Sequence, residues 1–215
     1  MGEPLLSITA RSLYISSIAA LLAFTASMAL SLYVSSKSRR AVEVAASFFE
    51  ALVGIPTTAV GLMVYMLLYP KGPLGILGIL YTPYAIIFGE FFVALPVAFT
   101  LMIRHVYNVR ELVRELILSL GGLERQSKVF LIRELSPILL SSYLTAFSRA
   151  IGELGVALIV GGGIEGYTNV LTTAIAIQTS IGNYEYAIYL GLILISITIA
   201  IISSLRALGE YVLWR

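Results

Sequence analysis

The stretch that decides the fold is RHVYNVRELVRELILSLGGLERQSKVFLIRELSPILLSSYLTAFSRAIGELGVALIVGGG, residues 104–163. Its first part is the longest charged segment of the chain. From Pro137 onward it is apolar up to the glycine triplet 161–163, interrupted by Arg149 and Glu153. A charged segment that leads into an apolar helix with ionisable residues inside is typical of a membrane protein whose helices enclose polar groups.

The composition of the whole chain also indicates a membrane protein. Of 215 residues, 59% are hydrophobic and 12% are charged, and the mean hydropathy is +0.94. Soluble domains carry about 25% charged residues, so this chain cannot present an ordinary charged surface to water. It has no Cys and 1 His, His105, which excludes disulfides, thiolate metal sites and multi-His metal sites. We therefore predict an all-α integral membrane protein, one domain over residues 1–215, without a cofactor or metal.

Five hydrophobic segments are long enough to cross a bilayer as helices, which takes about 20 apolar residues. The predicted spans are residues 12–36, 42–69, 83–103, 137–160 and 184–205. The first is longer than the core of about 7–15 residues in a cleaved signal peptide, which is the alternative. Pro56 and Pro96 lie inside spans, Pro137 is expected in the first turn of the fourth, and the glycine triplet is expected to end it. The apolar piece 170–177 is too short to cross and predicts a re-entrant or interfacial half-helix.

The distribution of Lys and Arg predicts the direction of the crossings. If segment 104–136 lies in the cytoplasm, eleven of the 14 basic residues lie there too, against Arg11 and Lys71 outside and Arg149 in the membrane. The eleven are Lys37, Arg39, Arg40, Arg104, Arg110, Arg114, Arg125, Lys128, Arg133, Arg206 and Arg215. Cytoplasmic loops carry an excess of Lys and Arg. This rule predicts a multi-pass plasma-membrane protein with its N-terminus outside and its C-terminus in the cytoplasm.

Segment 104–136 itself predicts a helical hairpin. Val109, Leu112, Val113 and Leu116 recur at helical spacing among charged residues, which predicts an amphipathic helix. Gly121-Gly122 is expected to end it, before a second short helix over 124–134. An ordinary solvated loop anchored to anionic lipid is the alternative, but it leaves two helices unexplained. A hairpin that cannot bury its apolar face alone predicts a protein partner.

The fourth span carries small residues on one face and charges beside it. The small face consists of Ser141, Thr145, Ser148, Gly152 and Gly155, and the neighbouring stripe of Ser142, Ala146, Arg149 and Glu153. Small residues let helices approach closely, so we expect this face to point inward and the Leu- and Ile-rich opposite side to face lipid. Arg149 and Glu153 are four residues apart and are predicted to pair.

The roles of these polar residues stay open at this point. The Arg149/Glu153 pair can lock the bundle or a dimer, attract or gate an anion on a transport path, or lie near a helix end with its charges reaching the interface. Glu90 in the third span is expected to be protonated or paired with Arg149. Hydroxyl groups offer neutral donors to a passing oxyanion, although helix packing is their commoner role: Thr57, Thr58, Ser141, Thr145 and Ser148.

These residues resemble a known family. Glu115 followed six positions later by Gly121 is similar to the coupling-loop motif of type-1 ABC importer permeases. That motif begins Glu-Ala-Ala, continues with Gly at this spacing and ends Ile-x-Leu-Pro. Here Leu116-Ile117 replaces Ala-Ala, Leu131 stands at the Ile position, and Arg133-Glu134 replaces Leu-Pro.

The rest of the chain resembles the tungstate-transport permeases, which are relatives of the molybdate and sulfate permeases. The likeness extends from about residue 10 to 205 and is carried by AFSRAIGELG at 146–155, IVGG at 159–162, TTAIA at 172–176, GIPT at 54–57 and GPLG at 72–75. It implies the type-1 permease fold, a second copy of the chain, a cytoplasmic ABC ATPase dimer and an extracytoplasmic binding protein that delivers the oxyanion. No nucleic acid partner is expected.

The resemblance also implies that residues 115–131 dock into the ATPase. Those expected to couple to it are Glu115, Gly121, Gly122, Glu124, Lys128 and Leu131. From their polar chemistry inside the spans, the residues expected along the translocation path or gate are Glu90, Thr145, Ser148, Arg149, Gly152 and Glu153.

The main hypothesis is therefore the permease subunit of an ATP-driven oxyanion importer, with tungstate first. The chain has no nucleotide-binding motif, so ATP hydrolysis is expected in a separate subunit. The alternatives are a molybdate or sulfate permease, a membrane-embedded enzyme that uses Glu90 and Glu153, and a purely structural membrane subunit. The enzyme hypothesis has no metal-ligating His pair or Ser–His arrangement and gives the hairpin no role.

Overall fold

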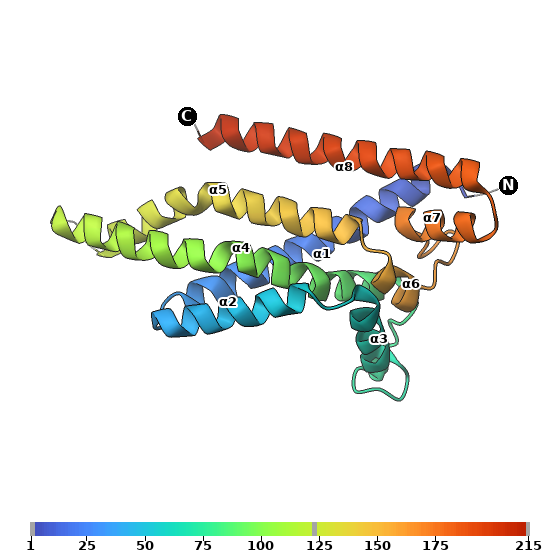
Figure 1. Ribbon diagram of the computed structural model, residues 1–215, viewed down its shortest axis with the longest axis horizontal. Helices are drawn as coiled ribbons and strands as arrows, with labels where there is room; N and C mark the ends of the chain where they lie inside the picture. Colours follow the sequence, from blue (N-terminus) through green and yellow to red (C-terminus); the bar gives the residue numbers. More distant parts are fainter. Residues whose placement is uncertain (1–2, 122–123, 214–215) are drawn as a thin grey trace.

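The structure, a computed structural model, describes residues 3–121 and 124–213, which contain helices and no strand. Four long helices follow its long axis (Figure 1): α1 (Leu5–Val34), α4 (Pro83–Ser119), α5 (Glu124–Ile151) and α8 (Tyr184–Leu213). Helix α2 (Arg39–Val53) lies beside α4, and α3 (Thr57–Leu68) is turned across the bundle. The shorter elements are η1 (Gly75–Leu77), α6 (Gly155–Gly161) and α7 (Leu171–Ser180). The predicted all-helical fold is confirmed.

The membrane prediction agrees with the lengths of these helices. Within the described ranges, α1, α4 and α8 are each long and apolar enough to cross a bilayer, and two bent pairs bring the total to as many as five. The chain is thus a multi-pass membrane protein. Helix α1 begins at one end of the long axis, whereas α8 ends toward the other, where the α4–α5 hairpin also lies (Figure 1).

The predicted span 42–69 is two helices rather than one. Helices α2 and α3 are bent by 96° at the break 54–56. Helix α2 starts at the N-cap Ser38, whose Oγ accepts a hydrogen bond from the Ala41 N–H at 3.3 Å. Pro56 occupies the N-cap of α3, and because proline has no N–H to continue the α2 ladder, the chain changes direction there.

The hairpin is built from extensions of two long helices, not from separate short ones. Helix α4 runs without a break from the predicted span into the amphipathic segment and ends at Ser119, just before Gly121 in a left-handed turn with φ 76°. Helix α5 begins at Glu124, so Pro137 lies inside it and the prediction of a first-turn position was wrong. The cost is one helical hydrogen bond, which a long helix packed against α4 tolerates.

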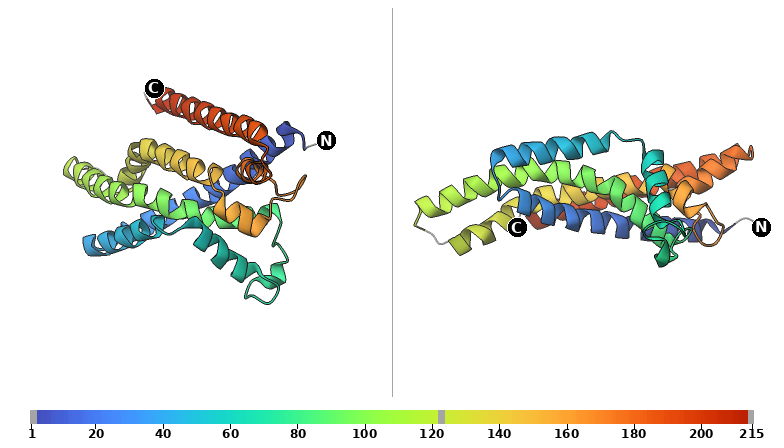
Figure 2. Two further views of the ribbon diagram at one scale, coloured as in Figure 1. Left: turned by 45° about the vertical axis from the view of Figure 1, so that its right-hand side comes forward. Right: turned by 90° about the horizontal axis from the view of Figure 1, so that it is seen from below.

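Small residues bring the central helices together. Alanines with no exposed surface lie on α1 (Ala19, Ala20, Ala23), α4 (Ala94, Ala98) and α5 (Ala146, Ala150). Close backbone approach of this kind drives helix packing in lipid. Helix α8 differs, because only 6% of its most apolar window is buried. It lies along one side of the bundle (Figure 2). Its exposed side chains include the apolar Ile188, Leu192 and Ile195.

The segment after the fourth predicted span closes one end of the bundle. The predicted span 137–160 is not one helix, because α5 ends at Ile151 and a separate helix, α6, begins at Gly155. The glycine triplet ends α6, whose last residue is Gly161 and whose C-cap Gly162 adopts φ 74°. Helix α7 forms the predicted short helix, with 10 residues. Its Leu171 and Ala174 pack against Ile8 of α1 and Leu190 of α8.

Candidate functional site

The break between α5 and α6 holds the predicted ion pair. Helix α5 ends at Ile151, α6 begins at Gly155, and the two are bent by 58°. Arg149 Nη1 donates to Glu153 Oε2 at 2.9 Å, so the predicted pairing is confirmed. The pair therefore lies where the backbone changes direction.

Glu153 joins three helices. Its side chain is 2% exposed, and its second oxygen, Oε1, accepts a hydrogen bond from the Val156 N–H at 3.1 Å. That N–H belongs to the first turn of α6, where N–H groups have no carbonyl acceptor within their own helix. The Glu153 carbonyl accepts a bond from Thr172 Oγ1 of α7 at 2.9 Å. Glu153 thus pairs with α5, caps α6 and anchors α7.

Arg149 borders the bend between α2 and α3, which we call the elbow. Its side chain is 33% exposed and lines a cavity of about 20 Å³, which is room for about one water. The other lining residues are Leu52, Val53, Ile55, Thr57, Val60, Phe92 and Val93. The first turns of α3 and α6 meet beside it, since a Cβ on Gly155 would lie 3.0 Å from Thr57 Oγ1 and from the Thr58 backbone nitrogen.

Glu90 is a second buried carboxyl, separate from the ion pair. Its side chain is 2% exposed, and among the described residues its Oε2 has no hydrogen-bond partner. Ser16 of α1 and Glu153 are close enough to interact electrostatically with the Glu90 carboxyl. Arg149 pairs with Glu153, so the hypothesis that Arg149 pairs with Glu90 does not hold in this state. The other prediction, a protonated Glu90, stays a prediction; the proton would avoid a second negative charge beside Glu153.

The small-residue face of α5 is partly buried within the described chain. Gly155 packs against the first turn of α3, whereas Ser141, Thr145 and Ser148 are half-buried and Gly152 is exposed; we call these last four the polar stripe. The opposite side is buried against other helices, through Phe147, Ala150 and Ile151 among others. Thr145 and Ser148 donate their hydroxyl hydrogens at 2.8 Å to the carbonyls of Ser141 and Leu144. The stripe therefore offers hydroxyl acceptors rather than the predicted donors.

Comparisons with known proteins give the family. No protein-family model matches the chain. It is 35% identical over 199 residues to the Tungstate uptake system permease protein TupB of Peptoclostridium acidaminophilum, covering 93% of this chain and 87% of that one. It is also 35% identical over 202 residues to the Probable anion ABC transporter permease protein of Haloferax volcanii, covering 92% and 87%. The chain belongs to the ABC transporter permease family. The TupB of Campylobacter jejuni is 38% identical over 148 residues, which is 69% of the permease and 62% of that relative.

The coupling residues predicted for the permease lie at or near the hairpin turn. Glu115 is exposed on α4, and Gly121 follows α4 in the turn. Leu131 is half-buried and packs with Met102, Val106 and Leu135, so it holds the two hairpin helices together. Gly122 lies outside the described residues, as do the side chains of Glu124 and Lys128, whose backbones belong to α5.

A polar cluster at the opposite end of the permease was not predicted. Arg11 Nη2 donates to Glu3 Oε1 and Arg11 Nη1 donates to the Asn169 carbonyl, both at 2.6 Å. Asn169 Nδ2 donates to Glu3 Oε2 at 3.4 Å. Burial alone would raise the pKa of Glu3, but hydrogen bonds from Arg11, the Gly166 backbone and Asn169 hold it below the ordinary value of 4.5. The partners are separated by up to 166 positions, and no local pattern connects them.

Proposed function

We propose that the permease is the membrane subunit of an ATP-driven importer for an oxyanion, with tungstate as the first candidate, and that residues 1–215 form one permease domain. Two relatives are named for tungstate uptake, at 35% and 38% identity. The Haloferax volcanii relative is named for an unspecified anion, so another oxyanion, molybdate or sulfate, is the second candidate. The relatives reported above are named as permeases, which supports the importer over the membrane-embedded enzyme.

The observation that carries the proposed path is the polar stripe of α5, which one copy of the chain covers only in part, with the 33% exposed Arg149 at its edge. A charged group at the bilayer centre costs about 2.5–3.5 kcal/mol on insertion scales, so such a face avoids lipid. Helix α8 exposes Ile188, Leu192 and Ile195, which suit lipid well. We infer that the polar stripe faces a water-filled path and that a second copy of the chain completes its wall.

The Arg149/Glu153 pair is the proposed gate of this path. In the state described, Glu153 neutralises Arg149 and also caps α6. If α5 moves relative to α6, these bonds break and the guanidinium becomes free to attract an anion. Glu90 lies on α4 three residues before Val93, which lines the Arg149 cavity, so it can act as an alternative partner for Arg149. Thr145, Ser148 and Gly152 continue the path along α5.

The hairpin is the proposed coupling element. Its outer surface carries exposed apolar side chains, including Leu112 at 66%, Leu116 at 56% and Leu120 at 76%. Exposed apolar residues grouped beyond the bilayer need a protein partner. ABC permeases work with separate ATPase subunits, and we infer that Glu115, Gly121, Gly122, Glu124 and Lys128 contact the ATPase while Leu131 keeps the hairpin rigid.

This assignment fixes the proposed orientation in the plasma membrane. The hairpin end is cytoplasmic, because the ATPase binds there, and it carries the excess of Lys and Arg. Helix α8 ends toward the same side, so the C-terminus is cytoplasmic and the N-terminus is outside. An extracytoplasmic binding protein would then meet the end formed by α6, α7 and the Glu3/Arg11/Asn169 cluster.

The test is the ATPase activity of the full chain reconstituted in proteoliposomes with its ATPase subunit and binding protein. We expect hydrolysis to rise with binding protein loaded with tungstate, and to rise less with molybdate or sulfate. Glu115→Ala should abolish the rise, whereas Glu111→Ala, an exposed residue one turn earlier on α4, should preserve it. Failure of any ATPase subunit to associate with the chain would refute the importer. An equal response to sulfate would refute the preference for tungstate.

A further inference from the structure

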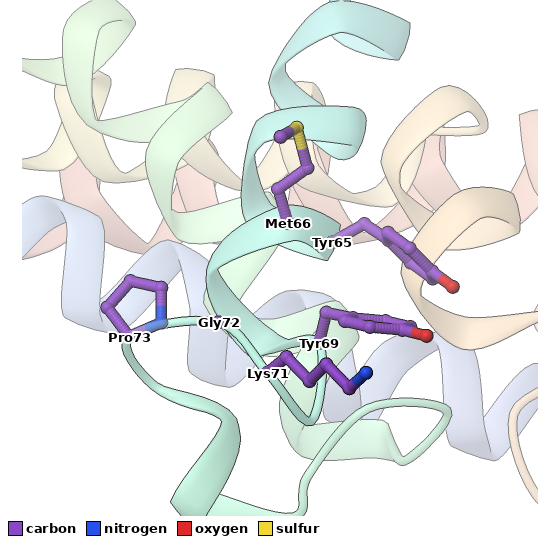
Figure 3. Close-up of a pocket in the computed structure, with 6 residues that line it drawn as sticks. All are labelled: Tyr65, Met66, Tyr69, Lys71, Gly72 and Pro73. Carbon is purple, nitrogen blue, oxygen red and sulfur yellow. The ribbon is translucent and has the colours of Figure 1, made fainter.

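A hollow of about 460 Å³ lies where α3 ends, and no hypothesis above uses it. It is lined by Tyr65, Met66, Tyr69, Lys71, Gly72 and Pro73 (Figure 3). Figure 3 shows the side chains of Tyr65, Tyr69 and Lys71 ending on the same side, with the two hydroxyls and the ammonium group outermost. Three side chains within residues 65–71 thus carry hydrogen-bond donors that point toward the same region.

The turn that carries Lys71 is tightly wound against the end of α3. The Gly72 N–H donates to the Tyr69 carbonyl at 2.6 Å, and the Leu74 N–H donates to the Leu67 carbonyl at 2.9 Å. A Cβ on Gly72 would lie 2.2 Å from the Met66 carbonyl oxygen, so only glycine fits. The backbone at Lys71 is thus held between Tyr69 and Gly72, while the Lys71 side chain is exposed.

A third tyrosine beside the hollow has a strained backbone. Tyr81 is the one non-glycine residue of the described chain with a positive φ, 60°. Its N–H donates to the Val160 carbonyl at 2.9 Å, and its ring lies 6.3 Å from that of Tyr65. The left-handed conformation is unfavourable for a bulky residue, and strain of this kind gathers at functional sites.

The charge of the hollow is unbalanced. Within the described ranges, no carboxylate lies within 4.0 Å of Lys71, and its ammonium donates no hydrogen bond that would cap α3. The carbonyls of Leu67 and Tyr69 already accept from backbone N–H groups. An ammonium and two phenol hydroxyls offer donors but no strong acceptor, which suits a phosphate-type anion.

We propose that this hollow binds a phosphate-type oxyanion group through Lys71 and the hydroxyls of Tyr65 and Tyr69. One source of such a group is the headgroup of an anionic phospholipid, whose acyl chains would lie along Met66 and the 95% exposed Ile76. The other is a free oxyanion entering the transport path, and only this source rests on the proposed function.

The experiment measures binding to the permease chain alone, without ATPase or binding protein, so that a failed importer does not decide it. Thermal unfolding in an uncharged detergent is followed while short-chain phosphatidylglycerol, inorganic phosphate or tungstate is titrated. We expect saturable stabilisation by at least one probe. Lys71→Gln should weaken it about tenfold, since one charge-assisted contact is lost. Lys71→Arg should retain it.

Two further variants make the outcome decisive. Lys37→Gln removes an exposed lysine from the turn between α1 and α2 and should bind like the wild type. Tyr69→Phe deletes one hydroxyl and should weaken binding even if Lys71→Gln fails to fold. A response to phosphatidylglycerol alone assigns the hollow to lipid, and a response to phosphate or tungstate assigns it to a free anion. The absence of saturable binding, or equal binding by wild type, Lys71→Gln and Tyr69→Phe, would overturn the proposal.

Discussion

Separating the two charges of the Arg149/Glu153 pair is the most informative perturbation of the permease. Glu153→Gln keeps an oxygen for the Val156 N–H but leaves the guanidinium without its partner. Removing one member of a buried pair costs about 3–5 kcal/mol. Because the Arg149 side chain is 33% exposed, we expect the lower end of that range, about 3 kcal/mol. Glu153→Ala also leaves the Val156 N–H unpaired, which adds about 1–3 kcal/mol.

The single variant Arg149→Met and the double variant Arg149→Met/Glu153→Gln complete a double-mutant cycle. Arg149→Met leaves a 2% exposed carboxylate with only the Val156 N–H as partner, so we expect a loss of about 3–5 kcal/mol unless the carboxyl binds a proton. Arg149→Met/Glu153→Gln removes both charges, and exchange of a whole buried pair for neutral residues is often close to neutral. The double variant should therefore be more stable than either single variant.

The assay is unfolding of the purified chain in lipid–detergent mixtures, with ATPase stimulation measured on the same four proteins. If the pair only locks the bundle, the double variant regains both stability and stimulated ATPase activity. If the pair gates the path, it regains stability while the anion response stays lost. The exposed contact of Arg104 with Glu43, at 3.3 Å, is the matched control and should show little coupling. Additive losses in the Arg149/Glu153 cycle would refute the pairing itself.

Three further predictions concern packing, coupling and pH. Gly155→Ala should destabilise the chain by about 1–3 kcal/mol because its Cβ would meet the α3 backbone, whereas Gly191→Ala, with open space around it, should not; unfolding curves decide. Gly121→Val forces a β-branched residue into φ 76°, at about 1–2 kcal/mol, and should lower stimulated ATPase activity; equal loss in Gly182→Val, with φ 80° in a distant turn, would contradict a coupling role. The pKa of Glu3 is lowered in the folded chain, so its stabilising bonds are complete above the ordinary value of 4.5 and are lost as pH falls through the lower folded value. Wild type and Glu3→Gln should therefore converge in unfolding temperature at acid pH. A difference that stays constant with pH would disprove this.

The sequence was sufficient to predict features that depend on neighbouring residues along the chain. The spacing of Arg149 and Glu153 places them one helical turn apart, and they pair as expected. Gly161 ends α6 because the glycines after it adopt conformations that other residues avoid. Prediction of α7 as a short helix likewise needed only its length and apolarity.

Features that depend on a completed assembly were not predictable in this way. The polar stripe stays only half-buried in one copy of the chain, and small residues mark a helix interface without telling whether the other helix belongs to the same chain. The contact between Glu3 and Asn169 spans 166 positions, and the bond from Thr172 to Glu153 spans 19. Such contacts follow from how the helices are arranged in space, which hydrophobic periodicity does not encode.

The two breaks in the helices lie against each other, and under the proposed function they offer a route by which a signal would cross the membrane. The elbow before α3 touches the break before α6, because Thr57 and Gly155 are in close contact beside Arg149. Helix α5 reaches this unit from the hairpin over 28 residues, about 42 Å at 1.5 Å per residue. A helix transmits displacement along its axis, so hairpin movement would reach Glu153 directly. At Glu153 two outcomes are possible: α5 carries α6 and α7 with it, or the bonds of Glu153 to Val156 and Thr172 break. Breaking these bonds would free Arg149 to face the proposed path.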